Sequence, residues 1–210
     1  MTAKYSIIVW DWNGTLLDDV AINLHIVNTL LHTRGIPPIS SERYKQVFRM
    51  PIRDFYNDIG FDMTKEPFEV IAHEYNRLYT AHFDTISLTE GVHDVLCHAR
   101  DKGIDQYILS ASEKTSLAYQ VNQKGISPFF QAIVGNDDFS VIGKIDKARL
   151  LAKELGNTKN ILFIGDLHHD AEVASAMGAD CVLYANGHQT TRKDPRYHLV
   201  YHMSEILNLL

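Results

Sequence analysis

The sequence predicts an α/β fold with a doubly wound, mainly parallel sheet, into which a small helical domain is inserted. Short apolar runs recur along the chain, and each ends at a polar residue or a glycine. Such runs are typical of strands that are buried on both faces of a parallel sheet. Stretches with helical spacing of apolar residues fill most of the gaps, and this alternation favours an α/β arrangement.

Length and composition are those of an ordinary globular protein. The chain has 210 residues, of which 45% are hydrophobic and 22% charged, enough for one sizeable domain or a core with a small insert. Its net charge of −6 gives no electrostatic reason to expect nucleic acid or an anionic membrane as a partner. No apolar run reaches membrane-spanning length, and Asp11 interrupts the first run too early for a signal peptide. We therefore expect a soluble cytoplasmic protein with two reduced cysteines, Cys97 and Cys181.

The core elements follow one another in a regular order. The predicted strands are residues 5–11, 105–112, 131–138, 160–166, 179–187 and 198–202. Helices are predicted at 91–103, 111–125, 147–156 and 171–178, and each ends near a glycine, which is a usual helix stop.

From about Val20 to about Asp84 the alternation fails. Helical spacing recurs at 21–35 and 67–83, with the breakers "GIPPIS" and "RMPIRDF" between them, and we predict no strand. The sequence thus predicts a core of residues 1–17 and 86–210 and a helical insert of residues 18–85. Ligands of open α/β sheets bind at the carboxyl ends of the strands, so an insert that leaves from that end would cover the site.

Acidic residues end two of the predicted strands. Asp11 closes "IIVWD", Asp166 closes "ILFIGD", and Asp170 follows four residues later. Parallel strands place their carboxyl ends at one edge, so these side chains are expected to converge. Converging buried carboxylates repel one another unless a cation is present, and Mg²⁺ is a hard ion that accepts such ligands. Aspartates at strand-to-helix turns also serve as caps, which is the alternative interpretation.

Groups suited to an anion lie at the same predicted edge. Lys144 follows a glycine in the connection to a helix, and Ser110 and Ser112 end a third strand just before another helix. A hydroxyl with free N–H groups at a helix N-terminus makes an anion site. Ser110 and Glu113 also have the spacing of a capping box, and both roles are compatible.

These motifs together resemble the haloacid dehalogenase superfamily of hydrolases, in its phosphoglycolate-phosphatase-like subgroup with a helical cap. The resemblance rests on "DWNGTLLD", the strand-end Ser110, the downstream Lys144 and "GDLHHD", supported by "GVHDVLCHARDKG" and the closing "ANGHQT" segment. It runs in order along nearly the whole chain, and it implies a Rossmann-like core beneath a cap domain.

The resemblance also implies roles for individual residues. Asp11 is implied to attack phosphorus and carry an aspartyl-phosphate, Ser110 to hold a phosphoryl oxygen, and Lys144 to neutralise charge. Substrate contacts are implied at Gly14, Ser110, Ala111 and Lys144. Mg²⁺ ligands are implied at Asp11, the backbone carbonyl of Asn13, Asp166 and Asp170, the last either as a ligand or as a support of the other ligands. The expected partner is a small phosphorylated metabolite, with neither nucleic acid nor membrane, and the chain is expected to be a monomer or a homodimer.

Asn13 departs from the family pattern, which has an aspartate that protonates the leaving group. An amide donates a hydrogen bond but transfers no proton in this way, and general acid–base catalysis contributes about 10²–10⁴-fold. Four interpretations stay open. The first is a phosphatase for substrates with acidic leaving groups, and the second is an introduced replacement at position 13. The third is deamidation of Asn13 beside Gly14, and the fourth is a protein that binds phosphorylated ligands without turnover.

Three further features bear on the substrate and the metal. Arg49 and Arg53 lie in the expected cap loop and are predicted to favour a second anionic group on the substrate, although both suit a solvated helix surface equally well. "DWNGT" is also similar to phosphonoacetaldehyde hydrolases, but those enzymes need a lysine where this loop has arginines. The adjacent His168 and His169 are expected to be ordinary loop or surface residues, because nitrogen ligands suit zinc better than magnesium.

Overall fold

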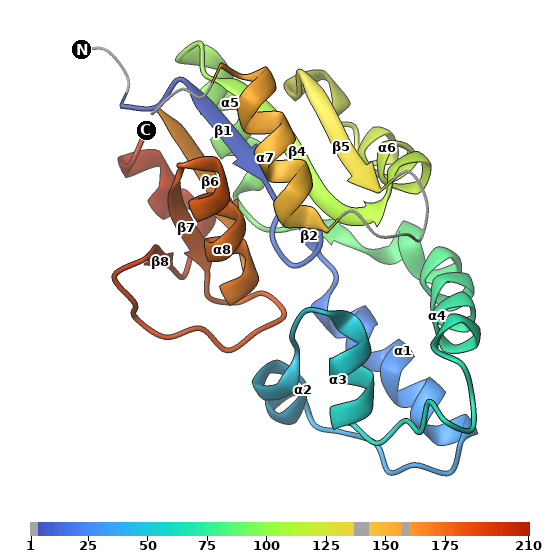
Figure 1. Cartoon of the computed structure of the whole chain (residues 1–210). Coiled ribbons are helices and arrows are strands. Elements are labelled where there is room, and N and C mark those ends of the chain that lie inside the picture. Colours follow the sequence, from blue (N-terminus) through green and yellow to red (C-terminus); the bar gives the residue numbers. More distant parts are fainter. Residues whose placement is uncertain (1–3, 137–142, 157–159) are drawn as a thin grey trace.

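The computed structural model describes residues 4–136, 143–156 and 160–210. Its centre is a six-stranded sheet of order β5-β4-β1-β6-β7-β8, in which every neighbouring pair is parallel (Figure 1). The strands are β1 (Ile7–Trp10), β4 (Asp105–Glu113), β5 (Ala132–Asn136), β6 (Ile161–Gly165), β7 (Asp180–Tyr184) and β8 (His198–Val200). The predicted fold class is confirmed. The last two residues of the predicted strand 131–138, and residues 140–142 before Lys144, lie outside the described part.

The position of β1 explains where a site forms. After β1 the chain builds β4 and β5 on one side and later β6, β7 and β8 on the other, so the strand order reverses at β1. Ile7 is in register with Asp105 on one neighbour and Ile161 on the other. The carboxyl ends of β1, β4 and β6 therefore meet at a topological switch point, the usual ligand position in such sheets.

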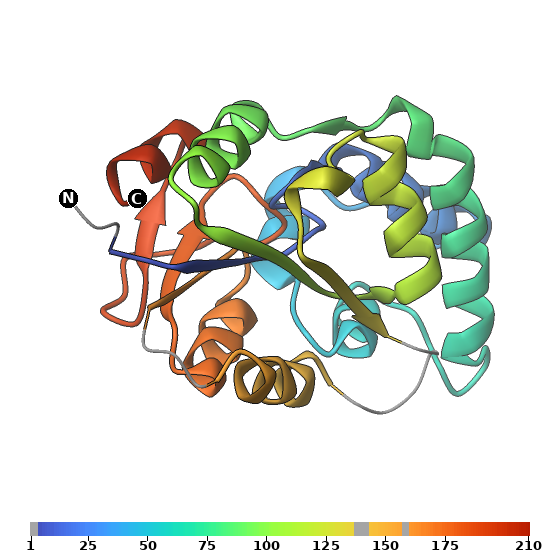
Figure 2. The same cartoon turned by 90° about the horizontal axis from the view of Figure 1, so that it is seen from above.

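Helices cover both faces of the sheet (Figure 2). One face packs against α5 (Val92–Asp101), α6 (Lys114–Gln123) and the 3₁₀ helix η3 (Met203–Asn208), and the other packs against α7 (Lys144–Glu154) and α8 (His168–Met177). Along β1 the side chains of Ile8 and Trp10 enter the first core, and those of Ile7 and Val9 enter the second. Burial on both faces is the reason that β1 is apolar throughout.

Four helices lie beyond the carboxyl end of the sheet, between β2 (Leu17–Asp18) and β3 (Ser87–Leu88), which pair antiparallel (Figure 1). They are α1 (Val20–Thr33), α2 (Ser41–Val47), α3 (Ile52–Asp58) and α4 (Phe68–His82). We call residues 20–82 the insert. The stretch "RMPIRDF", predicted to break helical structure, instead contains the start of α3, because Pro51 stands at its N-cap, where a missing N–H costs nothing.

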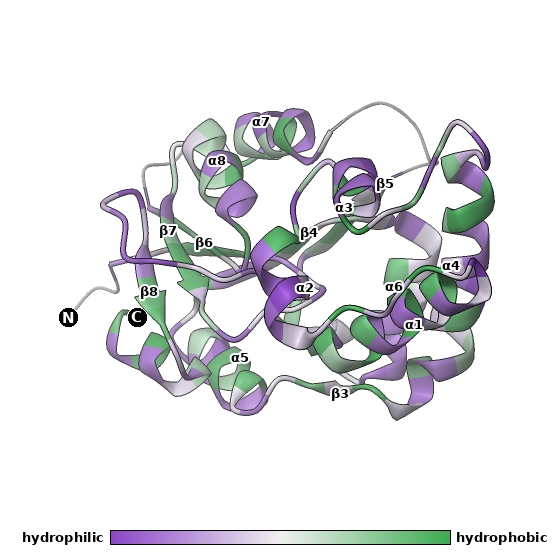
Figure 3. Ribbon diagram, turned by 90° about the horizontal axis from the view of Figure 1, so that it is seen from below, coloured by the Kyte–Doolittle hydropathy of each residue, from purple (hydrophilic) through white to green (hydrophobic). Residues whose placement is uncertain are grey.

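The apolar residues of the insert are continuous with the core on one face of the sheet. Figure 3 shows hydrophilic and hydrophobic residues mixed along its helices. Ile26 and Leu30 of α1, Phe55 of α3 and Ile71 of α4 are buried. The two short helices α2 and α3 were not predicted, because seven residues carry too little periodicity to reveal a helix. None of the described helices is long and apolar enough to cross a bilayer.

The remaining pieces are short. Two further 3₁₀ helices, η1 (Phe83–Thr85) and η2 (Ser127–Phe129), precede β3 and β5. Cys181 is buried and Cys97 is partly exposed, and both are free thiols, as the distance between them in the sequence predicts.

Candidate active site

Three buried carboxylates meet at the switch point. Asp11 directly follows β1, Asp166 directly follows β6, and Asp170 lies in the first turn of α8. One ligand oxygen from each can be chosen so that all lie within 4.8 Å of one another. The predicted convergence of these acids is therefore present in the structure.

Lys144 joins the cluster from the first turn of α7. Its Nζ lies 2.6 Å from Oδ1 of Asp11 and 2.7 Å from Oδ1 of Asp170, and the side chain is buried. The second oxygen of Asp170 accepts the backbone N–H groups of Asp166 (3.0 Å) and Leu167 (2.9 Å). Asp170 thus positions both the lysine and the loop after β6, with both of its oxygens engaged.

Gly14 is required by close packing at this point. Its backbone has φ +70°, and a Cβ there would lie 2.5 Å from Cδ2 of His188 and 2.6 Å from Oδ2 of Asp166. No other residue fits without displacing a pocket carboxylate. The neighbouring Thr15 donates to Oδ1 of Asp166 at 3.2 Å, which orients that carboxylate.

The electrostatics of the cluster favour a divalent cation. When all three carboxylates are ionised they outnumber the one ammonium group, which leaves two negative charges in excess. Burial, with repulsion from Asp170, raises the pKa of Asp11 to about 6 against the attraction of Lys144. Burial also raises the pKa of Asp166 to about 8, although His188 opposes the shift. A buried, oxygen-only ligand set with excess negative charge fits Mg²⁺, which prefers such ligands.

We expect Mg²⁺ to stabilise the protein more strongly as pH rises. Both pKa values lie above the ordinary 3.8. In the metal-free protein, protonation of Asp11 and Asp166 therefore contributes fully to the free energy of unfolding below about pH 4. This contribution is lost as pH rises through about 6 to 8, where the two carboxyl groups ionise in the folded state. Mg²⁺ competes with these protons, and at about 100 times its Kd it adds about 2.7 kcal/mol, or roughly 5–10 °C in Tm.

Thermal unfolding with and without Mg²⁺ between pH 5.5 and 8.5 measures this effect. The rise in Tm caused by Mg²⁺ should grow along the series and should be much smaller in Asp166→Asn. A rise that is equal at all pH values would contradict this assignment of the titrating groups.

Ser110 enters the site differently from the prediction. It is buried on β4, where its hydroxyl donates to Oγ of Ser112 at 3.1 Å, and Ser112 donates in turn to Oδ1 of Asn13 at 3.0 Å. β4 continues to Glu113, so Ser110 does not cap α6. The N-cap is Glu113, whose carboxylate accepts the N–H groups of Thr115 and Ser116, both at 2.7 Å.

That cap changes the expected anion site. Two of the N–H groups that were predicted to be free for an anion at this helix are already occupied by an acidic side chain. Ala111, predicted to contact substrate, has its carbonyl oxygen bound by Nδ2 of Asn136 at 2.8 Å. Its contact with substrate stays a prediction, and so does that of Ser110.

A second polar centre, not predicted from the sequence, lies beside the first. His188, in the loop after β7, donates its backbone N–H to Oδ2 of Asp166 at 2.6 Å. Its ring lies 3.0 Å from Oδ1 of Asp19 and 2.8 Å from the hydroxyl of Tyr44 in α2. Both Asp19 and His188 are almost completely buried. His188 therefore connects the carboxylate cluster to the insert.

Asp19 and His188 form a buried ion pair. Burial alone raises the pKa of Asp19, but His188 and the hydrogen-bond donors around it hold the pKa below its ordinary value. Burial lowers the pKa of His188, and Asp19 outweighs this effect and raises it. The signals in the sequence were slight: a second acid after Asp18, and a histidine that follows a strand end on the same edge of the sheet.

The loop that carries His188 also docks on α2. The N–H of Thr190 donates to the carbonyl of Lys45 at 2.9 Å, and Nε2 of Gln189 donates to the carbonyl of Phe48 at 2.8 Å. The ring of Phe48 stacks on that of His188 with centroids 4.8 Å apart. The insert is thereby attached to the core directly beside the carboxylate cluster.

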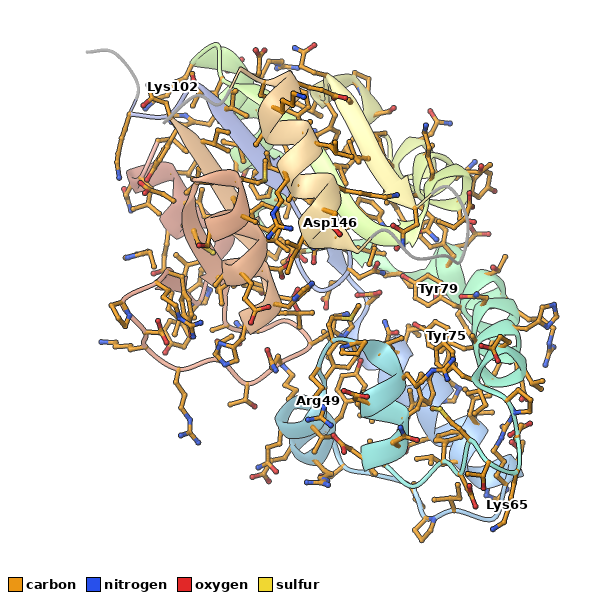
Figure 4. The ribbon with its side chains drawn as sticks, viewed as in Figure 1. Arg49, Lys65, Tyr75, Tyr79, Lys102 and Asp146 are labelled. Atoms are coloured by element: carbon orange, nitrogen blue, oxygen red, sulfur yellow. The ribbon has the colours of Figure 1, made fainter. Side chains whose placement is uncertain are left out.

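Arg49 and Arg53 are engaged elsewhere. Figure 4 shows Arg49 beside α2 and α3, where its guanidinium lies 2.9 Å from Asp58. Arg53 lies 3.0 Å from Glu69 and over the ring of Phe68. Both are about half exposed, and no contact within the described residues joins them to the carboxylate cluster. Their predicted contact with substrate stays a prediction.

The adjacent histidines open α8 and contact other side chains. His168 Nδ1 lies 3.2 Å from the hydroxyl of Tyr197, and His169 Nδ1 lies 3.1 Å from Glu172. In the part of the chain that the structure describes, the candidate metal cluster contains no histidine.

Fold and site together place the chain in one class of enzyme, the haloacid dehalogenase-like hydrolases. The model of that family matches residues 8–184, most of the chain, so the chain belongs to it. Among curated proteins, the phosphoglycolate phosphatase of Rhodobacter capsulatus is 22% identical over 195 residues, which cover 91% of this chain and 89% of that protein.

Solved structures agree on the fold. A haloacid dehalogenase-like hydrolase from Streptococcus pneumoniae superposes with a TM-score of 0.81 at 18% identity and covers 98% of both chains. CbbY from Rhodobacter sphaeroides gives a TM-score of 0.77 at 16% identity over 96% of both chains in its structure with phosphate, and a mutant of it has been solved with xylulose-(1,5)bisphosphate. The predicted family, the fold class and the assignment as a phosphatase-type hydrolase are confirmed.

Proposed function

We propose that the chain is a Mg²⁺-dependent phosphatase that hydrolyses a small phosphate monoester through an aspartyl-phosphate on Asp11. The observation that carries this proposal is the convergence of Asp11, Asp166 and Asp170 with Lys144 at the switch point of the sheet. The phosphoglycolate phosphatases among the curated relatives support this class of substrate, and so does the phosphate bound in a structural neighbour.

The chemistry takes two displacements at phosphorus. An oxygen of Asp11 attacks, and the bond from phosphorus to the leaving oxygen breaks, with its electron pair going to that oxygen. Water then attacks the aspartyl-phosphate and releases inorganic phosphate and the carboxylate. Lys144 orients Asp11 through Oδ1 and balances the negative charge that gathers during transfer.

Asp11 and Asp166 would hold the metal, with the backbone carbonyl of Asn13 and the support of Asp170 that the family resemblance implies. The bound ion would supply positive charge to the phosphoryl oxygens. Ser110 would offer its hydroxyl to a phosphoryl oxygen. The helical insert, attached beside the pocket through His188, would limit the entry of water.

Schiff-base chemistry, as in phosphonoacetaldehyde hydrolases, is not favoured. Among the described residues of the insert there are two lysines, Lys45 and Lys65. Lys45 donates to the carbonyl of Asn186 at 3.0 Å in an exposed contact, and Lys65 pairs with Asp62. An amine that forms an imine needs to be unprotonated and close to the reacting carbon.

The proposal is tested by phosphate release from 2-phosphoglycolate, acetyl phosphate and p-nitrophenyl phosphate. We expect turnover of at least one of these compounds with Mg²⁺, which chelation abolishes and added Mg²⁺ restores. Calorimetry with the same compounds separates the alternative, because a binding protein gives heat of binding without product. Neither heat nor phosphate release with any of them would contradict both functions.

A further inference from the structure

Asn13 is held in one orientation by three hydrogen bonds. Its Nδ2 donates to Oδ2 of Asp19 at 2.7 Å and to the hydroxyl of Tyr79 at 3.0 Å, and its Oδ1 accepts from Ser112 at 3.0 Å. Tyr79 reaches this point from α4, and Figure 4 shows it turned toward α1 together with Tyr75. Residue 13 is thus part of a polar network that spans the core and the insert.

Asp19 receives hydrogen bonds on both of its oxygens. Oδ1 accepts the backbone N–H of Gly14 at 2.9 Å and faces Nε2 of His188 at 3.0 Å. Oδ2 accepts from Asn13, from the hydroxyl of Tyr79 at 2.8 Å and from Nδ2 of Asn23 at 2.8 Å. Five donors surround a fully buried side chain, so the site is built for an anion.

This arrangement dictates what residue 13 has to be. The hydroxyl proton of Tyr79 is given to Asp19, so toward Asn13 that oxygen is an acceptor. Residue 13 therefore faces two acceptors and has to donate to both, which an amide does and an ionised carboxylate does not. An aspartate at 13 would place two carboxylates in contact in a buried region.

We propose that Asp19 fixes residue 13 as an amide, so that Asn13 positions the nucleophile loop and does not deliver a proton. The inference rests on the proposed function and narrows its substrate class to phosphates with weakly basic leaving groups, such as acyl and aryl phosphates. An oxygen of Asp11 forms a bond to phosphorus while the bond from phosphorus to the leaving oxygen breaks. The leaving oxygen keeps the electron pair of that bond and departs as a stable anion, without a proton from residue 13.

An exchange of the two residues tests the proposal. Asn13→Asp, Asp19→Asn and the double variant form a cycle in which the double variant keeps the volume and net charge of the natural chain. Each single change should lower Tm, the first by like-charge contact and the second by removing the partner of His188. The loss of Tm in the double variant should be smaller than the summed losses of the two single variants, by at least about 4 °C. Additive losses would overturn the proposal.

Activity on two substrates supplies an independent measure. The natural chain should hydrolyse p-nitrophenyl phosphate far faster than glycerol phosphate, whose leaving group is strongly basic. Asn13→Asp alone should leave that ratio within about threefold, whereas the double variant should gain about 10²–10⁴-fold on glycerol phosphate by acid–base catalysis. A full gain from Asn13→Asp alone would overturn the proposal.

Asn23→Asp is the matched control, because it also places a carboxylate against Oδ2 of Asp19 but lies on α1. It should lower Tm as Asn13→Asp does and leave the ratio of the two substrates unchanged. If no variant released phosphate from p-nitrophenyl phosphate, the proposed function would fail. The coupling in Tm would still decide whether Asp19 fixes residue 13.

Discussion

Asp11→Asn should lower phosphate release by at least about 10⁴-fold, because removal of a covalent nucleophile leaves only the binding and electrostatic contributions of the site. The amide has the shape of the carboxylate, and burial already raises the pKa of Asp11 to about 6. Loss of its charge therefore relieves the carboxylate cluster, and we expect the variant to fold.

Steady-state phosphate release measures the loss, and acid quenching during turnover tests its cause. The natural chain should retain a phosphoryl group that intact mass detects, and Asp11→Asn should not. Asp101→Asn, an exposed acid-to-amide change at the end of α5, is the control and should keep full turnover. A phosphorylated Asp11→Asn protein would place the nucleophile elsewhere.

Lys144→Met should have the second largest effect, on both stability and activity. It removes the ammonium group that contacts Asp11 at 2.6 Å and Asp170 at 2.7 Å, all three side chains being buried. Breaking a buried ion pair costs about 3–5 kcal/mol, because the remaining charge has no partner. The loss of charge compensation during transfer should lower turnover by about 10²–10³-fold.

Mg²⁺ distinguishes this explanation from a loss of packing. The ion also neutralises the cluster, so it should raise the Tm of Lys144→Met more than that of the natural chain. Lys147→Met is the matched control, since Lys147 is a buried lysine on the same helix that donates to the carbonyl of Gly135 and pairs with no acid among the described residues. Lys147→Met should lower Tm, but Mg²⁺ should raise its Tm by no more than it raises that of the natural chain. Equal responses in both variants would contradict the electrostatic role of Lys144.

The prediction worked best where a residue's position follows from its neighbours in sequence. Asp11 and Asp166 each end an apolar run, so burial of the run as a parallel strand delivers both carboxylates to one edge. Prediction failed where a local pattern allowed two outcomes. Ser110 and Glu113 have capping-box spacing, but β4 continues through Ser110 to pair with β5, and Glu113 becomes the cap.

The sequence by itself determined the fold class, the family and the acids and lysine of the pocket, because apolar periodicity and strand ends are local properties of the chain. Only the tertiary structure decided what surrounds Asn13. Asp19 pairs with His188, which lies 169 residues away, and Ser112 reaches Asn13 across 99 residues. Contacts of this kind depend on how separate loops pack and on which groups lose water together, and no local pattern records either.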